Sequence, residues 1–108
     1  MVLGVVLGLL LPSACLSPTL PLPPPDKPEK IEGPDSQGYV QMSGTMVPGA
    51  VAYARNQVTS EGSFKETNAD GFYQLRLRAE VGNGVLLWYT LNGERSQAVR
   101  FEIPAPVP

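Results

Sequence analysis

The side chains in this sequence that are best suited to acid–base chemistry are carboxylates, because the 108 residues include no histidine and one cysteine. The sequence therefore offers no Ser–His or Cys–His nucleophile pair and no cage of cysteine ligands for a metal ion. The carboxylates lie in polar sequence near turns or at outward strand positions, where no burial is expected to raise a carboxyl pKa. We predict a protein without catalysis of its own. The carboxylates considered are Glu61, Glu66, Asp70, Glu80, Glu94 and Glu102.

Oxygen ligands of the kind that calcium binds gather at one turn, where Glu66, Asn68 and Asp70 are close in the sequence. Calcium takes about six to eight oxygen ligands, which is more than these side chains supply. Asp70 is followed by Gly71, and Asp-Gly is a pair that forms tight hairpin turns. We interpret Asp70 as a turn residue and expect neither a metal ion nor another cofactor.

Arginine and aromatic side chains are the other residues with binding chemistry. Together they are typical of protein-interaction hot spots and of platforms on which sugars stack. The alternative is an ordinary solvated sheet face, with Trp88 or Tyr89 filling the core. The candidate interaction face consists of Tyr53, Phe72, Arg76, Arg78 and Arg100, with Trp88 as a further aromatic residue.

Short alternating segments, separated by turn residues, must position these side chains. No segment has helical spacing, and closely spaced strands with turns between them are typical of an antiparallel β-sandwich. Tyr73, Leu75 and Leu77 alternate with polar residues and are predicted to be buried. The expected strands cover residues 39–46, 50–56, 63–68, 72–78, 85–91 and 97–103.

Two of the other expected strands also have a distinct pattern of faces. Ala50, Ala52 and Ala54 fall on one face, which suits close packing, and Tyr53 then lies on the outer face. Residues 85–91 are apolar on both faces, which predicts a central strand covered on both sides. In the last strand, the inward positions are Val99, Phe101 and Ile103.

Three sequence blocks in this region are similar to those of a known family. They read GTMVPGAVAYARN, TNADGFYQL and GVLLWYTLNGERSQAVRFEIP and lie between Gly44 and Pro104. They resemble bacterial immunoglobulin-like repeats and the related carboxypeptidase-regulatory-like domains, which have the transthyretin (prealbumin) shape. The resemblance implies a cell-surface or periplasmic sandwich that serves as a spacer, a binding module or an accessory to another domain.

The first residues, MVLGVVLGLLLPSAC, form an apolar run that ends at Cys15. The run is shorter than the roughly 20 residues of a membrane-spanning helix and fits the apolar part of a secretory signal. Ser13 and Ala14 before Cys15 resemble the lipobox of bacterial lipoproteins, which usually has leucine where this chain has Pro12. The resemblance implies cleavage before Cys15, which leaves residues 1–14 as the signal peptide, and acylation of its new N-terminus.

An ordinary signal peptide, cut near the cysteine by chance, is the alternative to that interpretation. No residue from Met1 to Leu11 carries a charged side chain, so the signal is atypical or the true start lies upstream. A lone exposed thiol is a hazard in an oxidising compartment, and acylation would remove it. This physical reason favours the lipid.

The segment from Leu16 to Gln37 is rich in proline and then in charge. This composition is typical of extended, disordered chain, so we predict a proline-rich tether over residues 15–37. The β-sandwich domain is then expected at residues 38–104, followed by a short tail at residues 105–108.

These predictions describe an exported component of the bacterial cell envelope, in the outer membrane or facing the periplasm. It is held to the membrane by a lipid on Cys15 and presents a small β-sandwich as a structural or protein-interaction module. The alternative is a carbohydrate- or ligand-binding module that uses the aromatic and arginine face. The expected partner is an envelope protein or a glycan, and the formal net charge of −2 is too small to predict binding to nucleic acid.

Overall fold

A computed structural model describes residues 21–106 of the chain. The signal peptide, Cys15 and the first residues of the expected tether lie outside the described residues. Within the described range every regular element is a β-strand, and no helix there could cross a membrane. The strands are β1 (Lys30–Glu32), β2 (Tyr39–Thr45), β3 (Val51–Asn56), β4 (Gly62–Glu66), β5 (Phe72–Arg78), β6 (Gly84–Leu91), β7 (Glu94–Arg95) and β8 (Val99–Glu102).

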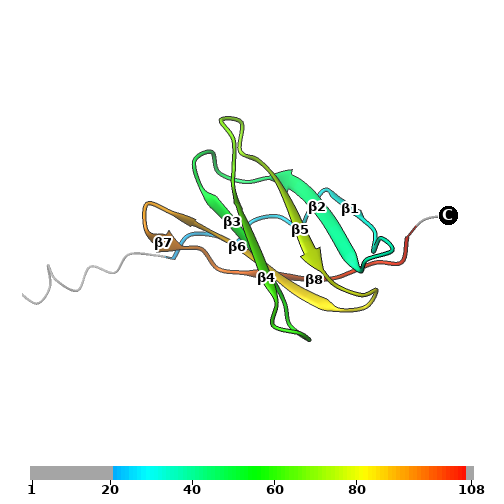
Figure 1. The fold of residues 1–108 in the computed structure, drawn as a ribbon. Helices are drawn as coiled ribbons and strands as arrows, with labels where there is room; N and C mark the ends of the chain where they lie inside the picture. Colours follow the sequence, from blue (N-terminus) through cyan, green and yellow to red (C-terminus); the bar gives the residue numbers. More distant parts are fainter. Residues whose placement is uncertain (1–20, 107–108) are drawn as a thin grey trace, which may run out of the picture.

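The strands form two antiparallel sheets that pack face to face (Figure 1). The smaller sheet has the order β1-β2-β5, and the larger sheet has the order β4-β3-β6. Both β7 and β8 pair with the remaining edge of β6, at opposite ends of that strand. This arrangement confirms the predicted all-β antiparallel sandwich.

The core lies between the two sheets and follows the alternation that the sequence predicted. Tyr73, Leu75 and Leu77 on β5 are each at most 2% exposed, and Leu75 pairs with Met42 across the smaller sheet. The small side chains of Ala52 and Ala54 on β3 let the larger sheet approach this layer closely. The prediction for the alanine face and for the apolar face of β5 is confirmed.

Tyr73 is the largest of these buried side chains, and its position depends on a glycine. Gly44 pairs with Tyr73, and a Cβ atom at Gly44 would lie 3.0 Å from the Tyr73 hydroxyl oxygen. The hydroxyl is buried and has no hydrogen-bond partner among the described residues. Burial, helped by the nearby charge of Glu29, raises the pKa of Tyr73 well above its usual range.

One buried polar residue, Asn56, ties the end of β3 to the turn before β6. Its side-chain nitrogen donates to the carbonyl oxygen of Arg78 at 3.1 Å and to Oδ1 of Asn83 at 3.0 Å. Its Oδ1 accepts a hydrogen bond from the backbone N–H of Val58 at 2.9 Å. These bonds compensate for the burial of the amide and fix the loop between β3 and β4.

The predicted free tether is wrong for the part of it that the structure describes. Strand β1 pairs with β2, and Ile31 packs against the core from this edge position. Leu22 forms a parallel bridge with Ser96, and Pro25 is buried. The prediction from composition failed for two reasons. Proline and charged residues outnumber the few apolar side chains that dock, so the average composition does not show them. Proline also has little conformational freedom to lose when the segment docks.

Candidate interaction face

The structure does not bring the five predicted face residues together. Phe72, Arg76 and Arg78 lie on β5 and point outward from the smaller sheet, since the residues between them are buried. Tyr53 on β3 and Arg100 on β8 point outward from the larger sheet. Because the sheets pack through their inner faces, the two groups lie on opposite sides of the sandwich.

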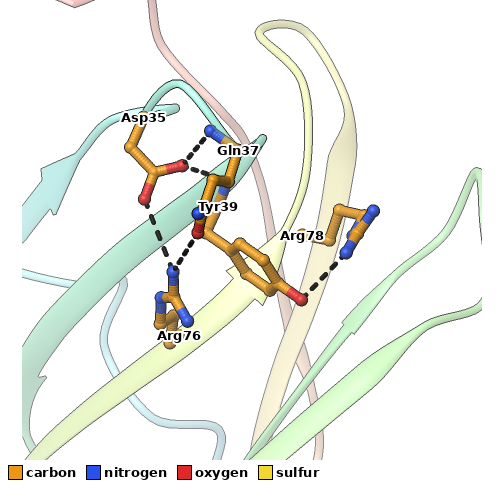
Figure 2. Close-up of polar contacts among 5 residues, drawn as sticks. All are labelled: Asp35, Gln37, Tyr39, Arg76 and Arg78. Atoms are coloured by element: carbon orange, nitrogen blue, oxygen red, sulfur yellow. Dashed lines mark hydrogen bonds and ion pairs between the residues drawn. The ribbon is translucent and has the colours of Figure 1, made fainter.

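On the smaller sheet, a carboxylate and two arginines surround Tyr39 (Figure 2). Oδ1 of Asp35 accepts hydrogen bonds from the backbone N–H groups of Gln37 and Tyr39, each at 2.9 Å. The Arg76 guanidinium lies 3.6 Å from the other carboxylate oxygen and 3.9 Å from the Tyr39 ring centroid. Arg78 donates to the Tyr39 hydroxyl at 2.9 Å.

The electrostatics of this cluster favour its charged forms. The hydrogen bond from the Tyr39 N–H, followed by that from Gln37 and the charge of Arg76, lowers the pKa of Asp35. The hydrogen bond to the Tyr39 hydroxyl raises the pKa of Arg78. The hydrogen bonds and the ion pair of these groups are made within the cluster and hold the turn that leads into β2. The cluster therefore has a structural role.

On the larger sheet, three aromatic rings and one arginine form a line across four strands. Phe64 on β4 pairs with Tyr53 on β3, and Tyr53 pairs with Trp88 on β6. The ring centroids are 5.8 Å apart for Tyr53 and Phe64 and 5.6 Å apart for Tyr53 and Trp88. The guanidinium carbon of Arg95 on β7 lies 4.4 Å from the Trp88 ring centroid. We call Phe64, Tyr53, Trp88 and Arg95 the aromatic row.

The rings of the row stack on one another rather than lying side by side as a flat platform. The Tyr53 and Trp88 planes differ by 5°, and two coplanar rings would need centroids about 6.5 Å apart to avoid a clash. At 5.6 Å the two rings form an offset stack, in which each partly covers one face of the other. Arg95 covers the opposite face of Trp88, because β7 and β3 flank β6 on opposite sides. The free aromatic surface is greatest at Phe64, which is 70% exposed.

Apolar and cationic side chains continue the face beside the row. Leu86 on β6 lies between Arg55 on β3 and Arg100 on β8 in the strand register. Arg100 donates to Gln57 at 2.8 Å and lies 3.7 Å from a carboxylate oxygen of Glu102, whereas Arg55 donates to the Ser60 hydroxyl at 3.3 Å. A shallow depression beside the row is lined by Val51, Tyr53, Phe64, Lys65 and Glu66.

The structure decides the place of two aromatic residues that the sequence left open. Tyr89 is 4% exposed and faces the core, so Trp88 lies on the outer side of β6. The prediction that this strand is covered on both sides is therefore wrong, since cross-strand side chains rather than a second layer cover its outer face. Phe64 and Arg95 were missed from the sequence, although each had a local signal. Phe64 is an apolar residue between the polar Ser63 and Lys65 in an expected strand, and Arg95 closely follows the Asn92-Gly93 turn signal.

The turn considered for calcium is organised by hydrogen bonds from its own backbone. Oδ1 of Asn68 accepts from the N–H groups of Asp70 and Phe72, each at 2.9 Å. Gly71 has the positive φ of 82° that the Asp-Gly signal predicted. Over residues 21–106, no three Asp, Glu, His or Cys side chains lie close enough together to hold a metal ion.

No family model, no curated protein and no solved structure matches the chain. The class that the geometry defines is a two-sheet antiparallel sandwich in which one outer face carries the cluster of Asp35, Tyr39 and two arginines and the other carries the aromatic row.

Proposed function

We propose that the protein is an exported, lipid-anchored and non-enzymatic component of the bacterial cell envelope. Its domain, of the immunoglobulin-like or prealbumin-like type, acts as a structural or protein-interaction module. The observation that supports an interaction role best is the aromatic row with its neighbouring arginines. Tryptophan, tyrosine and arginine are the residues most enriched in interface hot spots.

The stacking within the row favours a protein partner over a glycan. A sugar ring stacks on a free aromatic face, and both faces of Trp88 are already partly covered, one by Tyr53 and the other by Arg95. A protein surface can instead use ring edges, the Leu86 side chain and the arginine donors, which need no free ring face. The carbohydrate-binding alternative depends on Phe64, which is the most exposed aromatic residue of the row.

A photo-crosslinking residue placed in living cells tests the interaction role. Benzoylphenylalanine at Phe64 should give a protein adduct, and the same residue at Gln74, exposed on the other outer face, should not. The adduct should be lost in Trp88→Ala and kept in Arg76→Ala. Adducts of equal yield from both positions would contradict a specific face. Retention on insoluble envelope polysaccharide that requires Phe64 would favour the glycan alternative.

The anchoring part of the proposal is supported by Cys15, which follows Ser13 and Ala14 at the end of the apolar run. Cys15→Ala should release the protein from the membrane fraction, and labelled fatty acid should enter only the wild type. A soluble wild-type protein whose mature N-terminus lies beyond Cys15 would contradict anchoring at this residue.

A further inference from the structure

The chain segment ahead of β2 crosses from one sheet to the other, as its path from beside β7 to β1 in Figure 1 shows. We call residues 22–32 the strap. At its first seat, on the larger sheet, Leu22 bridges Ser96 and its carbonyl oxygen accepts a hydrogen bond from the Gln97 N–H at 3.0 Å. At its second seat, on the smaller sheet, β1 pairs with β2.

Several contacts between these seats hold the strap on the domain. Pro25 is buried, and the Glu29 N–H donates to the Ser43 carbonyl oxygen at 2.9 Å. Ile31 packs against the core from β1. The prolines of the segment have fixed φ angles, so the chain loses less conformational freedom when it docks than an ordinary segment would.

The first seat limits the length of chain between Cys15 and the sandwich. Leu22 is seven residues after Cys15 and can be at most about 25 Å from it. The free tether that the sequence predicted, Leu16 to Gln37, would extend to about 70 Å in polyproline II geometry. Docking therefore shortens the reach of the anchored domain to roughly a third.

We infer that the docked strap keeps the anchored sandwich within about 25 Å of the bilayer surface, so that the partner of the aromatic row is a protein in or on the same membrane. This inference rests on the proposed anchoring at Cys15. The seat at Ser96 and Gln97 directly follows Arg95, which is one end of the aromatic row. That end of the row is consequently the part of the interaction face nearest to the anchor point.

The single cysteine and single tryptophan of the chain allow a direct test of this geometry. The protein is coupled through the thiol of Cys15 to a maleimide lipid in phosphatidylcholine vesicles that contain a dansyl-labelled lipid. Energy transfer from Trp88 to the dansyl group then reports how close the sandwich lies to the bilayer. Chemical coupling makes this result independent of natural acylation.

Two variants carry the same insertion of about ten Gly and Ser residues, which adds roughly 17 Å of root-mean-square reach. One insertion lies between Ser17 and Pro18, ahead of the first seat, and should at least halve the transfer. The other lies between Asp26 and Lys27, after the first seat, and should leave the transfer unchanged. Equal losses in both variants, or a wild type with no more transfer than the first variant, would overturn the inference.

Hydrogen exchange on the protein without lipid tests the strap separately from the anchor. The amide protons of Gln97 and Glu29 should be protected, since each donates to a strap contact. If both exchange at the rate of unstructured chain, the strap is not seated and the inference fails, whatever happens at Cys15. If Cys15→Ala leaves the protein in the membrane fraction while these amides stay protected, the proposed anchoring fails and the docked strap stands.

Discussion

Arginine side chains lie on both outer faces of the sandwich, and the two faces hold them differently. On the smaller sheet, Arg76 pairs with Asp35, and Arg78 bonds to the Tyr39 hydroxyl. On the larger sheet, Arg100 pairs with Glu102, whereas Arg55 and Arg95 form no ion pair with any residue that the structure describes, and Arg95 lies on Trp88 instead. A cation that no carboxylate of the domain pairs remains available to a carboxylate of a partner. Arg78 on the smaller sheet meets this condition too, so the unpaired arginines favour the larger sheet only together with the aromatic row.

The apolar residues of the two outer faces show the same contrast. The smaller sheet turns Gln41, Ser43 and Gln74 outward, with Phe72 at the start of β5 as an exposed apolar side chain. The larger sheet turns Leu86 and Trp88 outward and leaves them half-buried. Half-buried aromatic and aliphatic groups lose less conformational freedom when a partner covers them, since their neighbours already restrict them. An outer face is therefore recognised as an interaction face by which of its side chains lack partners within the domain, and not by its arginine content alone.

The prediction with the largest expected effect tests whether β5 has one solvent-exposed face and one buried face. Leu75→Ala should lower the free energy of unfolding by about 2 to 5 kcal/mol, because it removes a core side chain that is 1% exposed. Arg76→Ala, the next residue, should cost less than about 1 kcal/mol, because its ion pair and its contact with Tyr39 are exposed to solvent. Denaturant melts of both variants make the comparison. Equal losses would mean that β5 is covered on both faces.

That strand also shows what local sequence can predict. The alternation of residues 72–78 and the turn at Gly71 depend on chemistry within a few residues, and the structure has both as predicted. The buried alanines of β3 were predictable for the same reason. The side of β6 that faces the core was not, because its residues are apolar on both sides and only the packed sheets decide.

The aromatic row and the strap depend on contacts between distant parts of the chain. Tyr53 meets Phe64 and Trp88 through the registers of β3 with β4 and β6, next to which the Asn56 side chain at the end of β3 bonds to the following loop. The strap docks through single residues such as Leu22 and Ile31, which a compositional average does not detect. Local sequence shows some of the residues of each feature but not which of them meet, so the contacts required the structure.

The second prediction tests the packing beneath the outer face of the smaller sheet. Gly44→Ala should cost about 1 to 3 kcal/mol of unfolding free energy, because the new methyl group would lie within 3.2 Å of the buried Tyr73 side chain and of the Glu29 backbone nitrogen. Ser43→Ala, one residue away and on the outward side of β2, should change stability by less than about 0.5 kcal/mol. Thermal melts are sufficient for both. A neutral Gly44→Ala would mean that Tyr73 moves freely and does not fix the core.

The third prediction separates stability from binding on the aromatic face. Trp88→Ala should cost about 1 to 2.5 kcal/mol, because it removes a stacked ring pair and a cation–π contact. Phe64→Ala should cost less than about 0.5 kcal/mol, since its ring is 70% exposed, yet should reduce partner binding as strongly. Melts and binding assays of both variants are compared. A Phe64→Ala protein that binds its partner normally would move the contact away from this end of the row.

The smallest expected effect concerns the charge that holds the outer face of the smaller sheet together. The folded-state pKa of Asp35 is lowered by the Tyr39 and Gln37 N–H groups and by Arg76, so the folded protein binds a proton there less readily than the unfolded chain does. The stabilisation by this carboxylate is therefore complete above its unfolded pKa of about 3.9 and is lost as the pH falls through the lower folded pKa. Asp35→Asn should be slightly less stable than wild type at pH 7, and the difference should shrink below about pH 4.

Asp70→Asn is the control, because the carboxylate of Asp70 makes no ion pair within residues 21–106. Urea melts from pH 7 to pH 2.5 measure the stability of both variants. If the loss of stability in Asp35→Asn grew toward low pH, the pH dependence would have the opposite sign to the one expected. Asp35 would then not belong to the network that holds the outer face of the smaller sheet.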